Sequence, residues 1–450
     1  MSPTARADRF RYDSFIVDPA DGTVTCTYST GGHQFTERYG FGTDEDWSDP
    51  AVAAAARVLF LMAGVSYYKT TAAPLVDLGT TLTTPEERAF LLRYYQEGLG
   101  EFAYRNDLDL RGLEFTGPDD GAPTVTTYLP DPDRPLIPFG GGIDSIVTVE
   151  TLRPSHPDVT LCVVGPPGER FAAIEDAAAV TEDPIVHVTR QIDPQVRRSA
   201  ELGFLNGHVP ITAVLTATAV VAAVLGRRDA VILSNEWSAS APTLVHGDRL
   251  INHQWSKGDV FEREFAQLIG RRLGPRLSVF SYLRPRSELW VAHQFAALTQ
   301  FHGAFRSCNR AFHQNPAQRL DHWCARCDKC CFIDLILAPF MDAEPLGRVF
   351  GGDEPLQLEE NAARFQSLIG LEPDAKPFEC VGDVNECRAA VLLAAAREDR
   401  QKTPLLQSLR EKVRSADGGG AIDRATLLAP MGSHYIPERY ASPDLLVRTR

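Results

Sequence analysis

The sequence predicts an α/β protein whose central part is a doubly wound parallel sheet. An N-terminal α+β domain precedes this part, and a helical, cysteine-containing region follows it. Two patterns support the prediction: short apolar runs alternate with helical patterns between residues 130 and 300, and five of the nine cysteines fall within 24 residues after that. The length of 450 residues exceeds what one hydrophobic core usually holds. We therefore expect three parts, at residues 1–116, 130–300 and 301–450.

The first part is expected to combine a small antiparallel sheet with helices. Apolar runs separated by turn-forming residues predict strands at 15–17, 23–28 and 34–41. Asp49 followed by Pro50 is typical of a helix start, and that helix is expected to end at Gly64. Thr84 followed by Pro85 predicts a second helix in the same way.

The central part contains the alternation that predicts parallel strands. The expected strands are 136–139, 159–164, 185–188, 230–234 and 277–280, and the expected helices include 143–152, 210–225, 259–273 and 287–299. Because ligands bind at the carboxyl ends of the strands in such sheets, functional residues are expected just after each strand.

The most apolar run, Val209 to Leu225, is 17 residues long and contains three threonines. This is at the short end for crossing a bilayer, so we interpret it as a buried helix and expect no membrane association. The N-terminus lacks the apolar core of an export signal, which predicts a cytoplasmic location. After residue 300 the expected helices are 332–340, 355–371 and 384–397.

The chain is acidic, with 45 Lys plus Arg against 59 Asp plus Glu and a net charge of −14. This balance argues against binding to a nucleic-acid backbone, and an anionic ligand would require a local concentration of cations. Only six residues are lysine, and three of them, Lys257, Lys329 and Lys376, lie in the motif segments described below. We expect these three lysines to lie near the glycine-rich turn.

That turn is the sequence from Gly140 to Ser145, which joins an expected strand to an expected helix. Consecutive glycines let backbone N–H groups converge, and the helix N-terminus adds its positive dipole end, so the turn can cradle a phosphate. A simple tight turn is the alternative interpretation. The pattern does not fit the Walker A or the dinucleotide-binding fingerprint. It resembles the PP-loop of the ATP pyrophosphatase superfamily, with glycine in place of the leading serine.

The resemblance implies the adenine nucleotide alpha hydrolase-like fold and cleavage of ATP between its α- and β-phosphates. The implied ATP contacts are Gly140, Gly141, Gly142, Asp144 and Ser145 at the phosphates, with Val164 and Gly165 at the adenine. The Asp144 carboxylate suits Mg²⁺, which prefers oxygen ligands; its alternative role is a charge at a helix N-terminus.

The cysteine cluster has the spacing Cys308-x15-Cys324-x2-Cys327-x2-Cys330, with Cys331 adjacent. Four thiolates at such spacing can hold a structural Zn²⁺ or an iron–sulfur cluster. A third interpretation is a metal-free group of thiols, buried or catalytic. A PP-loop followed by such cysteines resembles the 7-cyano-7-deazaguanine synthases, whose chains are about half this length.

A closer resemblance comes from several segments taken together, namely 140–145, 234–237, 280–285, 288–290, 305–310, 323–330 and 376–382. Over roughly residues 10 to 440 they are similar to the UDP-N-acetylmuramoyl-L-alanyl-L-glutamate epimerases. The resemblance implies conversion of the terminal L-Glu of UDP-MurNAc-L-Ala-L-Glu to D-Glu, with ATP and Mg²⁺, in peptidoglycan precursor synthesis. It implies an acyl-adenylate and release of AMP and pyrophosphate. The sequence identifies no protein partner.

The candidate catalytic residues are Cys380, Lys376, Asp328 and Lys257. A thiol such as Cys380 can move the α-proton of glutamate, and a lysine can neutralise an enolate or phosphates. Each also has a structural interpretation, as a buried thiol or a solvated charge. A substrate with a diphosphate and several carboxylates needs bidentate cations, so Arg284, Arg286, Arg306 and Arg310 are candidate substrate-binding residues.

Three other functions fit parts of the sequence. A PP-loop ligase would adenylate a carboxylate and form an amide or nitrile, a tRNA-thiolating enzyme would use the cysteines for sulfur transfer, and a non-catalytic module would bind zinc and nucleotide. The acidic balance and the absence of a basic tract argue against the tRNA enzyme.

Overall fold

The computed structural model describes residues 6–121, 125–313, 315–371, 377–416 and 424–446. Its main feature is a ten-stranded sheet with the order β12-β9-β6-β7-β8-β3-β2-β1-β4-β5. The five central strands are β6 (Pro135–Pro138), β7 (Thr160–Gly165), β8 (Ile185–Gln191), β9 (Ala230–Leu233) and β12 (Ser278–Ser281). All neighbouring pairs among these five are parallel. The prediction of a parallel sheet is confirmed for this part of the chain.

The N-terminal strands continue the same sheet, which is therefore mixed rather than purely parallel. They are β1 (Arg9–Asp18), β2 (Thr23–Thr30), β3 (His33–Gly40), β4 (Leu75–Asp77) and β5 (Glu114–Thr116). The link is the antiparallel pairing of β3 with β8, in which Tyr39 lies opposite Arg190. The antiparallel hairpin predicted near the N-terminus is confirmed, whereas the division into three domains stays a prediction.

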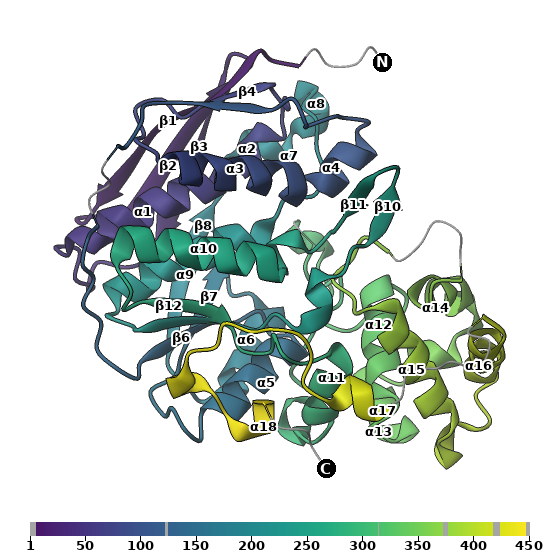
Figure 1. Ribbon diagram of the computed structural model, residues 1–450. Coiled ribbons are helices and arrows are strands. Elements are labelled where there is room, and N and C mark those ends of the chain that lie inside the picture. The colour runs from purple at the N-terminus through teal and green to yellow at the C-terminus, as the bar shows by residue number, and fades with distance from the viewer. Residues whose placement is uncertain (1–5, 122–124, 314, 372–376, 417–423, 447–450) are drawn as a thin grey trace.

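Helices cover both faces of the sheet (Figure 1). On one face lie α1 (Pro50–Ala63), α9 (Ile211–Leu225) and α10 (Asp259–Leu273), and on the other lie α5 (Ile143–Leu152) and α6 (Ala172–Thr181). Alternate residues of β9 enter two different cores, with Ala230 and Ile232 in one and Val231 and Leu233 in the other. This alternation follows from the period of two in a strand.

The predicted helix starts of the N-terminal part are confirmed by their caps. The Asp49 carboxylate accepts a hydrogen bond from the backbone N–H of Ala51 at 2.8 Å. At the start of α3 (Pro85–Gly98), Thr84 and Glu87 form a reciprocal capping box. The short helices α2 (Val65–Tyr68) and α4 (Gly100–Arg105) follow these two long helices, and α7 (Pro194–Arg197) and α8 (Ser199–Leu202) follow β8.

One stretch, Pro50–Tyr68, is long and apolar enough to cross a membrane, yet 83% of its most apolar window is buried inside the protein. Such burial is typical of a core helix. The run predicted as a buried helix, which forms α9, is likewise almost entirely buried.

The C-terminal helices form a lobe beside the sheet, at the lower right of Figure 1. They are α11 (Glu288–Ala296), α12 (Asp328–Leu337), α13 (Ala343–Val349), α14 (Ala362–Leu368), α15 (Val384–Ala395), α16 (Pro404–Ala416) and α17 (Arg424–Leu428). The last helix, α18 (Pro443–Leu446), is drawn below α5 in Figure 1, apart from this lobe. The prediction of one helix over 355–371 is wrong, because two 3₁₀ turns precede α14. The buried Asn361 amide donates to the carbonyls of Ala325 and Pro355 at this break.

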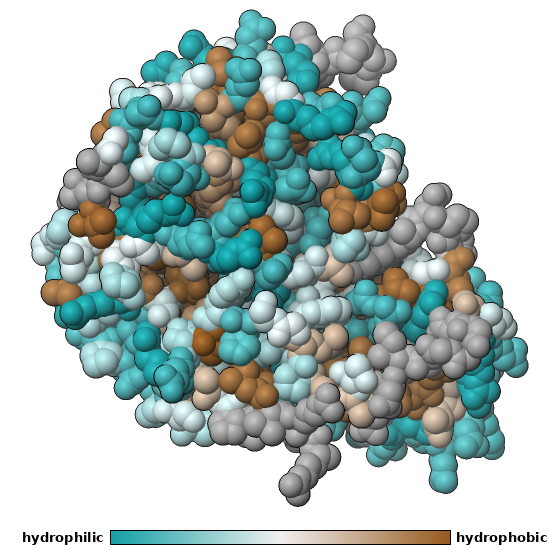
Figure 2. All heavy atoms as spheres, in the orientation of Figure 1, coloured by the Kyte–Doolittle hydropathy of each residue, from teal (hydrophilic) through white to brown (hydrophobic). Residues whose placement is uncertain are grey.

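Polar and apolar side chains are intermixed on the face shown in Figure 2. The hairpin of β10 (Leu244–His246) and β11 (Arg249–Ile251) stands out from the surface. Its Val245 and Leu250 side chains are 63% and 61% exposed.

Candidate active site

A cavity of about 420 Å³ lies where the central parallel strands end. Its walls include residues at or just after the ends of β6, β7 and β9, such as Phe139, Val164 and Ser234. The strand order reverses between β6 and β9, which is the position where ligands bind in open α/β sheets. The sequence predicted functional residues at this edge, and the cavity lies there.

The glycine-rich turn forms one wall of this cavity, through Gly140, Gly142, Asp144 and Ser145. Gly141 has φ of +73°, and a Cβ there would lie 2.6 Å from the carbonyl oxygen of Ala173 in α6. The turn therefore needs glycine at this position both for its backbone conformation and for space. The Ser145 hydroxyl donates to the carbonyl of Gly142 at 3.0 Å, which holds the first turn of α5 against the loop.

Three carboxylates meet beside the loop. Atoms of Asp144, Glu236 and Glu288 lie within 4.8 Å of one another. Burial and the nearby Glu236 raise the pKa of Asp144 to about 6, and burial with Asp144 raises the pKa of Glu288 well above its usual value. Among the described residues, one oxygen each of Asp144 and Glu288 is buried without a hydrogen-bond partner.

Such a group of oxygen atoms has the chemistry of a site for a hard divalent cation. The sequence identified Asp144 alone. Glu236 lies in the motif 234–237 just after β9, and Glu288 lies in the motif 288–290 at the start of α11, so membership of these motifs was the available signal for both.

Cys380 lines the cavity together with Lys257 and Lys329. The Lys329 ammonium donates a hydrogen bond to the Cys380 carbonyl. Burial by itself raises the pKa of the Cys380 thiol, but the charges of Lys257, His253 and Lys329 outweigh burial and lower the pKa to about 6. Two of the three lysines expected at the glycine loop are therefore confirmed there, and Lys376 lies outside the described residues.

The other candidates lie away from the cavity. Asp328 is partly exposed and faces Arg364 at 3.5 Å. Arg284 is buried and bonds the Glu262 carboxylate at 2.8 Å, and buried Arg286 donates to the carbonyls of Leu445 and Leu428. Arg306 and the exposed Arg310 line a second cavity of about 670 Å³ near the cysteines.

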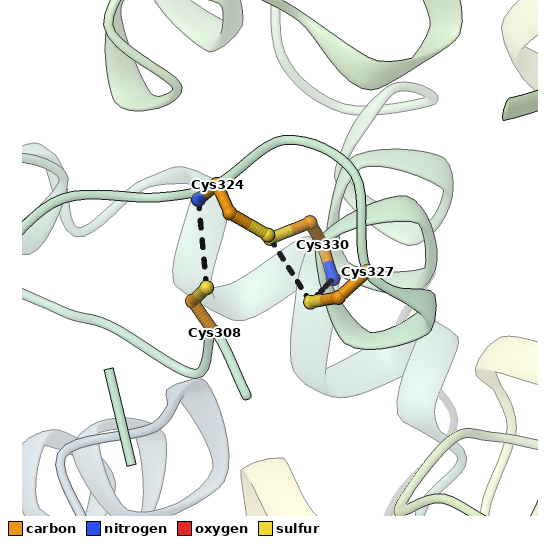
Figure 3. Close-up of side chains that lie close together, drawn as sticks. All are labelled: Cys308, Cys324, Cys327 and Cys330. Atoms are coloured by element: carbon orange, nitrogen blue, oxygen red, sulfur yellow. Dashed lines mark hydrogen bonds between the residues drawn. The ribbon is translucent and has the colours of Figure 1, made fainter. Parts of the chain in front are cut away.

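The four cysteines of the predicted set come together, as Figure 3 shows, with their sulfur atoms within 4.8 Å of one another. The Sγ atoms of Cys327 and Cys330 are 3.4 Å apart, and those of Cys324 and Cys330 are 3.7 Å apart. Cys331 is buried outside the group. The geometry matches a site that can hold a metal ion in four-thiolate coordination.

The cysteine cluster also borders the first cavity through its sequence neighbours. Ser307 and Asn309 flank Cys308, and Lys329 lies between Cys327 and Cys330 in sequence; all three line the cavity. The arrangement of the four cysteines therefore also positions one wall of the cavity.

Fold and site together define a class: an α/β protein with a glycine-rich loop at the switch point of its sheet and a four-cysteine cluster beside it. Family models described as the MurL N-terminal domain and the MurL C-terminal domain match residues 1–282 and 304–421. The chain therefore belongs to the MurL family.

Curated relatives agree with this assignment. A protein of Xanthomonas oryzae pv. oryzae is 36% identical over 387 residues, which are 86% of this chain and 84% of the relative. A Micromonospora protein is 36% identical over 97% of both chains, and a Salinispora tropica protein is 36% identical over 97% of this chain and 95% of its own length. All three are named UDP-N-acetyl-alpha-D-muramoyl-L-alanyl-L-glutamate epimerase. No solved structure matches the chain.

The close contact at Gly141 generates a testable prediction. Gly141→Ala should lower the free energy of unfolding by about 1–3 kcal/mol, because alanine is strained at positive φ and its Cβ meets the backbone of α6. Urea unfolding followed by circular dichroism measures this. Gly270→Ala in α10 is the matched control, since no heavy atom outside its own helix lies within 4 Å of an added Cβ. Equal stabilities for the two variants would contradict the assigned role of Gly141.

Proposed function

We propose that this chain is a cytoplasmic, ATP-dependent epimerase that converts the terminal L-Glu of UDP-MurNAc-L-Ala-L-Glu to D-Glu during peptidoglycan precursor synthesis. Membership of the MurL family and the names of the relatives support the substrate. One observation supports the mechanism. The glycine loop, the Asp144 carboxylate, two lysines and Cys380 all line the same cavity.

In this proposal the fold is that of the PP-loop enzymes, and the loop from Gly140 to Ser145 binds the ATP phosphates. Its backbone N–H groups and the N-terminus of α5 supply donors and a positive potential. Adenine packs against Val164 and Gly165 at the end of β7, beside the apolar side chain of Ile174.

The site also fits Mg²⁺, because two buried oxygens of the carboxylate group have no partner among the described residues. Asp144, Glu236 and Glu288 would hold the ion, which when bound supplies positive charge to the phosphates. Lys257 adds a second positive charge on the cavity wall.

Adenylation explains why a cleft of this kind epimerises glutamate. The α-proton beside an ionised carboxylate is hard to remove, because the product would carry two adjacent negative charges. Attack of a substrate carboxylate oxygen on the α-phosphorus of ATP breaks the bond to pyrophosphate and gives a neutral acyl group. The resulting acyl-adenylate can delocalise a carbanion as an enolate.

Cys380 is then the base: its thiolate takes the Cα proton, and the electron pair of the C–H bond passes into the enolate. A proton returns to the opposite face of Cα from an acid, for which Lys257 and Lys329 are the candidate ammonium groups on the cavity wall. Water then cleaves the acyl–AMP bond, so that ATP and water yield AMP and pyrophosphate for each inverted glutamate.

The remaining candidate residues fit this proposal unequally. Arg310 is exposed on the second cavity and is assigned to anionic groups of the substrate, with Arg306 beside it. Arg284 and Arg286 would contribute by stabilising the buried segments that they contact. Roles for Lys376 and Asp328 in catalysis stay predictions.

Purified protein incubated with UDP-MurNAc-L-Ala-L-Glu, ATP and Mg²⁺ in deuterated water tests the function. We expect D-Glu by chiral chromatography, AMP rather than ADP, and deuterium at the α-carbon, because the proton is exchanged with solvent during inversion. Omission of ATP is the control. Production of ADP, an unlabelled α-carbon, or a product one mass unit lighter as for an amide would contradict the proposal.

The role of Cys380 is tested by Cys380→Ser. Epimerisation should fall by about 10²–10⁴-fold, because a serine hydroxyl is a far weaker base than a thiolate. AMP formation should persist in the same variant, since adenylation does not require the thiol, and it serves as the internal control for folding and ATP binding. Inversion at the wild-type rate by this variant would exclude Cys380 as the base.

We further propose that the four cysteines bind a structural Zn²⁺. Metal analysis of the full-length protein should find about one zinc ion per chain. Cys327→Ser should remove the zinc, whereas Cys331→Ala should retain it because Cys331 lies outside the group. Iron together with sulfide would instead indicate an iron–sulfur cluster, and a protein without metal would leave the cluster as a group of free thiols.

A further inference from the structure

A buried carboxylate, Glu101, and an imidazole, His253, lie near Cys380. Glu101 lies in α4 and is 5% exposed. Its Oε2 atom is 2.5 Å from Nδ1 of His253, which follows β11. The His253 imidazole in turn interacts electrostatically with the Cys380 thiol. A carboxylate and an imidazole, from positions 101 and 253, are therefore hydrogen-bonded to each other, and the imidazole interacts with the thiol of Cys380, which lines the cavity.

Further contacts hold Glu101 and the segment around Cys380 in place. Arg105 donates to the other Glu101 oxygen at 2.6 Å, and its guanidinium lies 4.9 Å from the ring centre of Phe378. The Gln254 amide, next to His253, donates to the carbonyl of Val381 at 3.3 Å. Because these contacts join the segments before and after Cys380 to α4 and to the 253–254 segment, the thiol has a defined position relative to the imidazole.

The charged forms of His253 and Cys380 stabilise each other. Burial lowers the pKa of His253, but its interactions with Cys380 and Glu101 outweigh burial and raise the pKa to about 9. With the pKa of Cys380 at about 6, an imidazolium and a thiolate coexist between about pH 6 and pH 9. The other titratable groups that face the pair are Lys257, Lys329, Asp144, Glu379 and His208.

His208 completes the surroundings of the imidazole. Its ring centre is 4.1 Å from that of His253. Burial and the charge of His253 lower the pKa of His208 to about 4, so His208 is neutral where His253 is charged. Although Glu101, His208 and His253 could together ligate a metal, the short bond between Glu101 and Nδ1 of His253 occupies two of those ligand atoms and favours the ion pair.

We propose that Glu101 and His253 are positioning residues that hold Cys380 as a thiolate aimed into the cavity. The inference rests on the proposed function, in which that thiolate takes the Cα proton of the acyl-adenylate. In this step the proton moves to Sγ of Cys380 and the C–H electron pair enters the enolate, while His253 keeps its own proton. The N-terminal helix α4 thereby takes part in the reaction through His253, without contacting the substrate.

Alkylation of Cys380 tests the inference without ATP or substrate. The full-length protein is treated with iodoacetamide between pH 5 and 10, and mass spectrometry follows the peptide that contains Cys380. In the wild type the rate should rise with an inflection near pH 6, because only the thiolate above its pKa reacts. In His253→Asn the inflection should move to about pH 8 or higher, and the rate at pH 7 should fall by about tenfold or more.

Glu101→Gln keeps the size of the side chain and should shift the inflection in the same direction by a smaller amount, because the imidazolium loses its anionic partner. His322→Asn is the matched control, since the His322 side chain is 66% exposed and lies outside the cavity wall. Its alkylation curve should coincide with that of the wild type. AMP formation by each variant reports that the nucleotide site is folded.

Identical alkylation curves for the wild type, His253→Asn and Glu101→Gln would overturn the inference, whatever the epimerase activity. If the alkylation curves shift as expected, and the acid limb of the pH–rate profile for epimerisation moves to higher pH by the same amount, the inference and the proposed function are both supported. If the curves shift but Cys380→Ser still inverts glutamate at the wild-type rate, the proposed role of Cys380 fails while the coupling of the three residues stands.

Discussion

The packing of Gly141 against α6 is the contact on which the site depends. Because no Cβ intervenes, the loop after β6 can lie against the backbone of Ala173 and Ile174, and α5 then begins at the edge of the cavity. This start places Asp144 and Ser145 on the cavity wall. Because the loop is held at this edge of the sheet, it lines the same cavity as Asp144, the two lysines and Cys380.

The distribution of charge is the second constraint. A protein with a net charge of −14 must concentrate its free cations if it is to bind nucleotides and a diphosphate substrate. Lys257 and Lys329 supply that concentration beside the thiol, whereas several arginines are committed to buried pairs, as with Arg284 and Glu262. Two of the six lysines therefore line the cavity, whereas the buried Arg284 and Arg286 serve the packing.

The site draws on every part of the chain. The cysteine cluster positions Ser307, Asn309 and Lys329 on one wall, and the segment around Cys380 closes the cavity from the C-terminal lobe. The N-terminal part contributes Glu101 through its contact with His253. The strands of this N-terminal part join the sheet that carries the glycine loop through the pairing of β3 with β8.

Local signals in the sequence determined the parallel strands, the capped helix starts, the glycine loop and the four cysteines, because each depends on residues close together in the chain. The motif segments likewise predicted that Lys257 and Lys329 would lie near the loop. The tertiary structure decided the rest: that the N-terminal strands extend the central sheet, that Glu236 and Glu288 join Asp144, and that Glu101 and His253 stand behind Cys380. Residues 101, 253 and 380 are separated by more than a hundred positions, and no periodicity or spacing relates them. Only the packing of α4 and the C-terminal lobe around the ends of the sheet brings these three side chains close enough to interact.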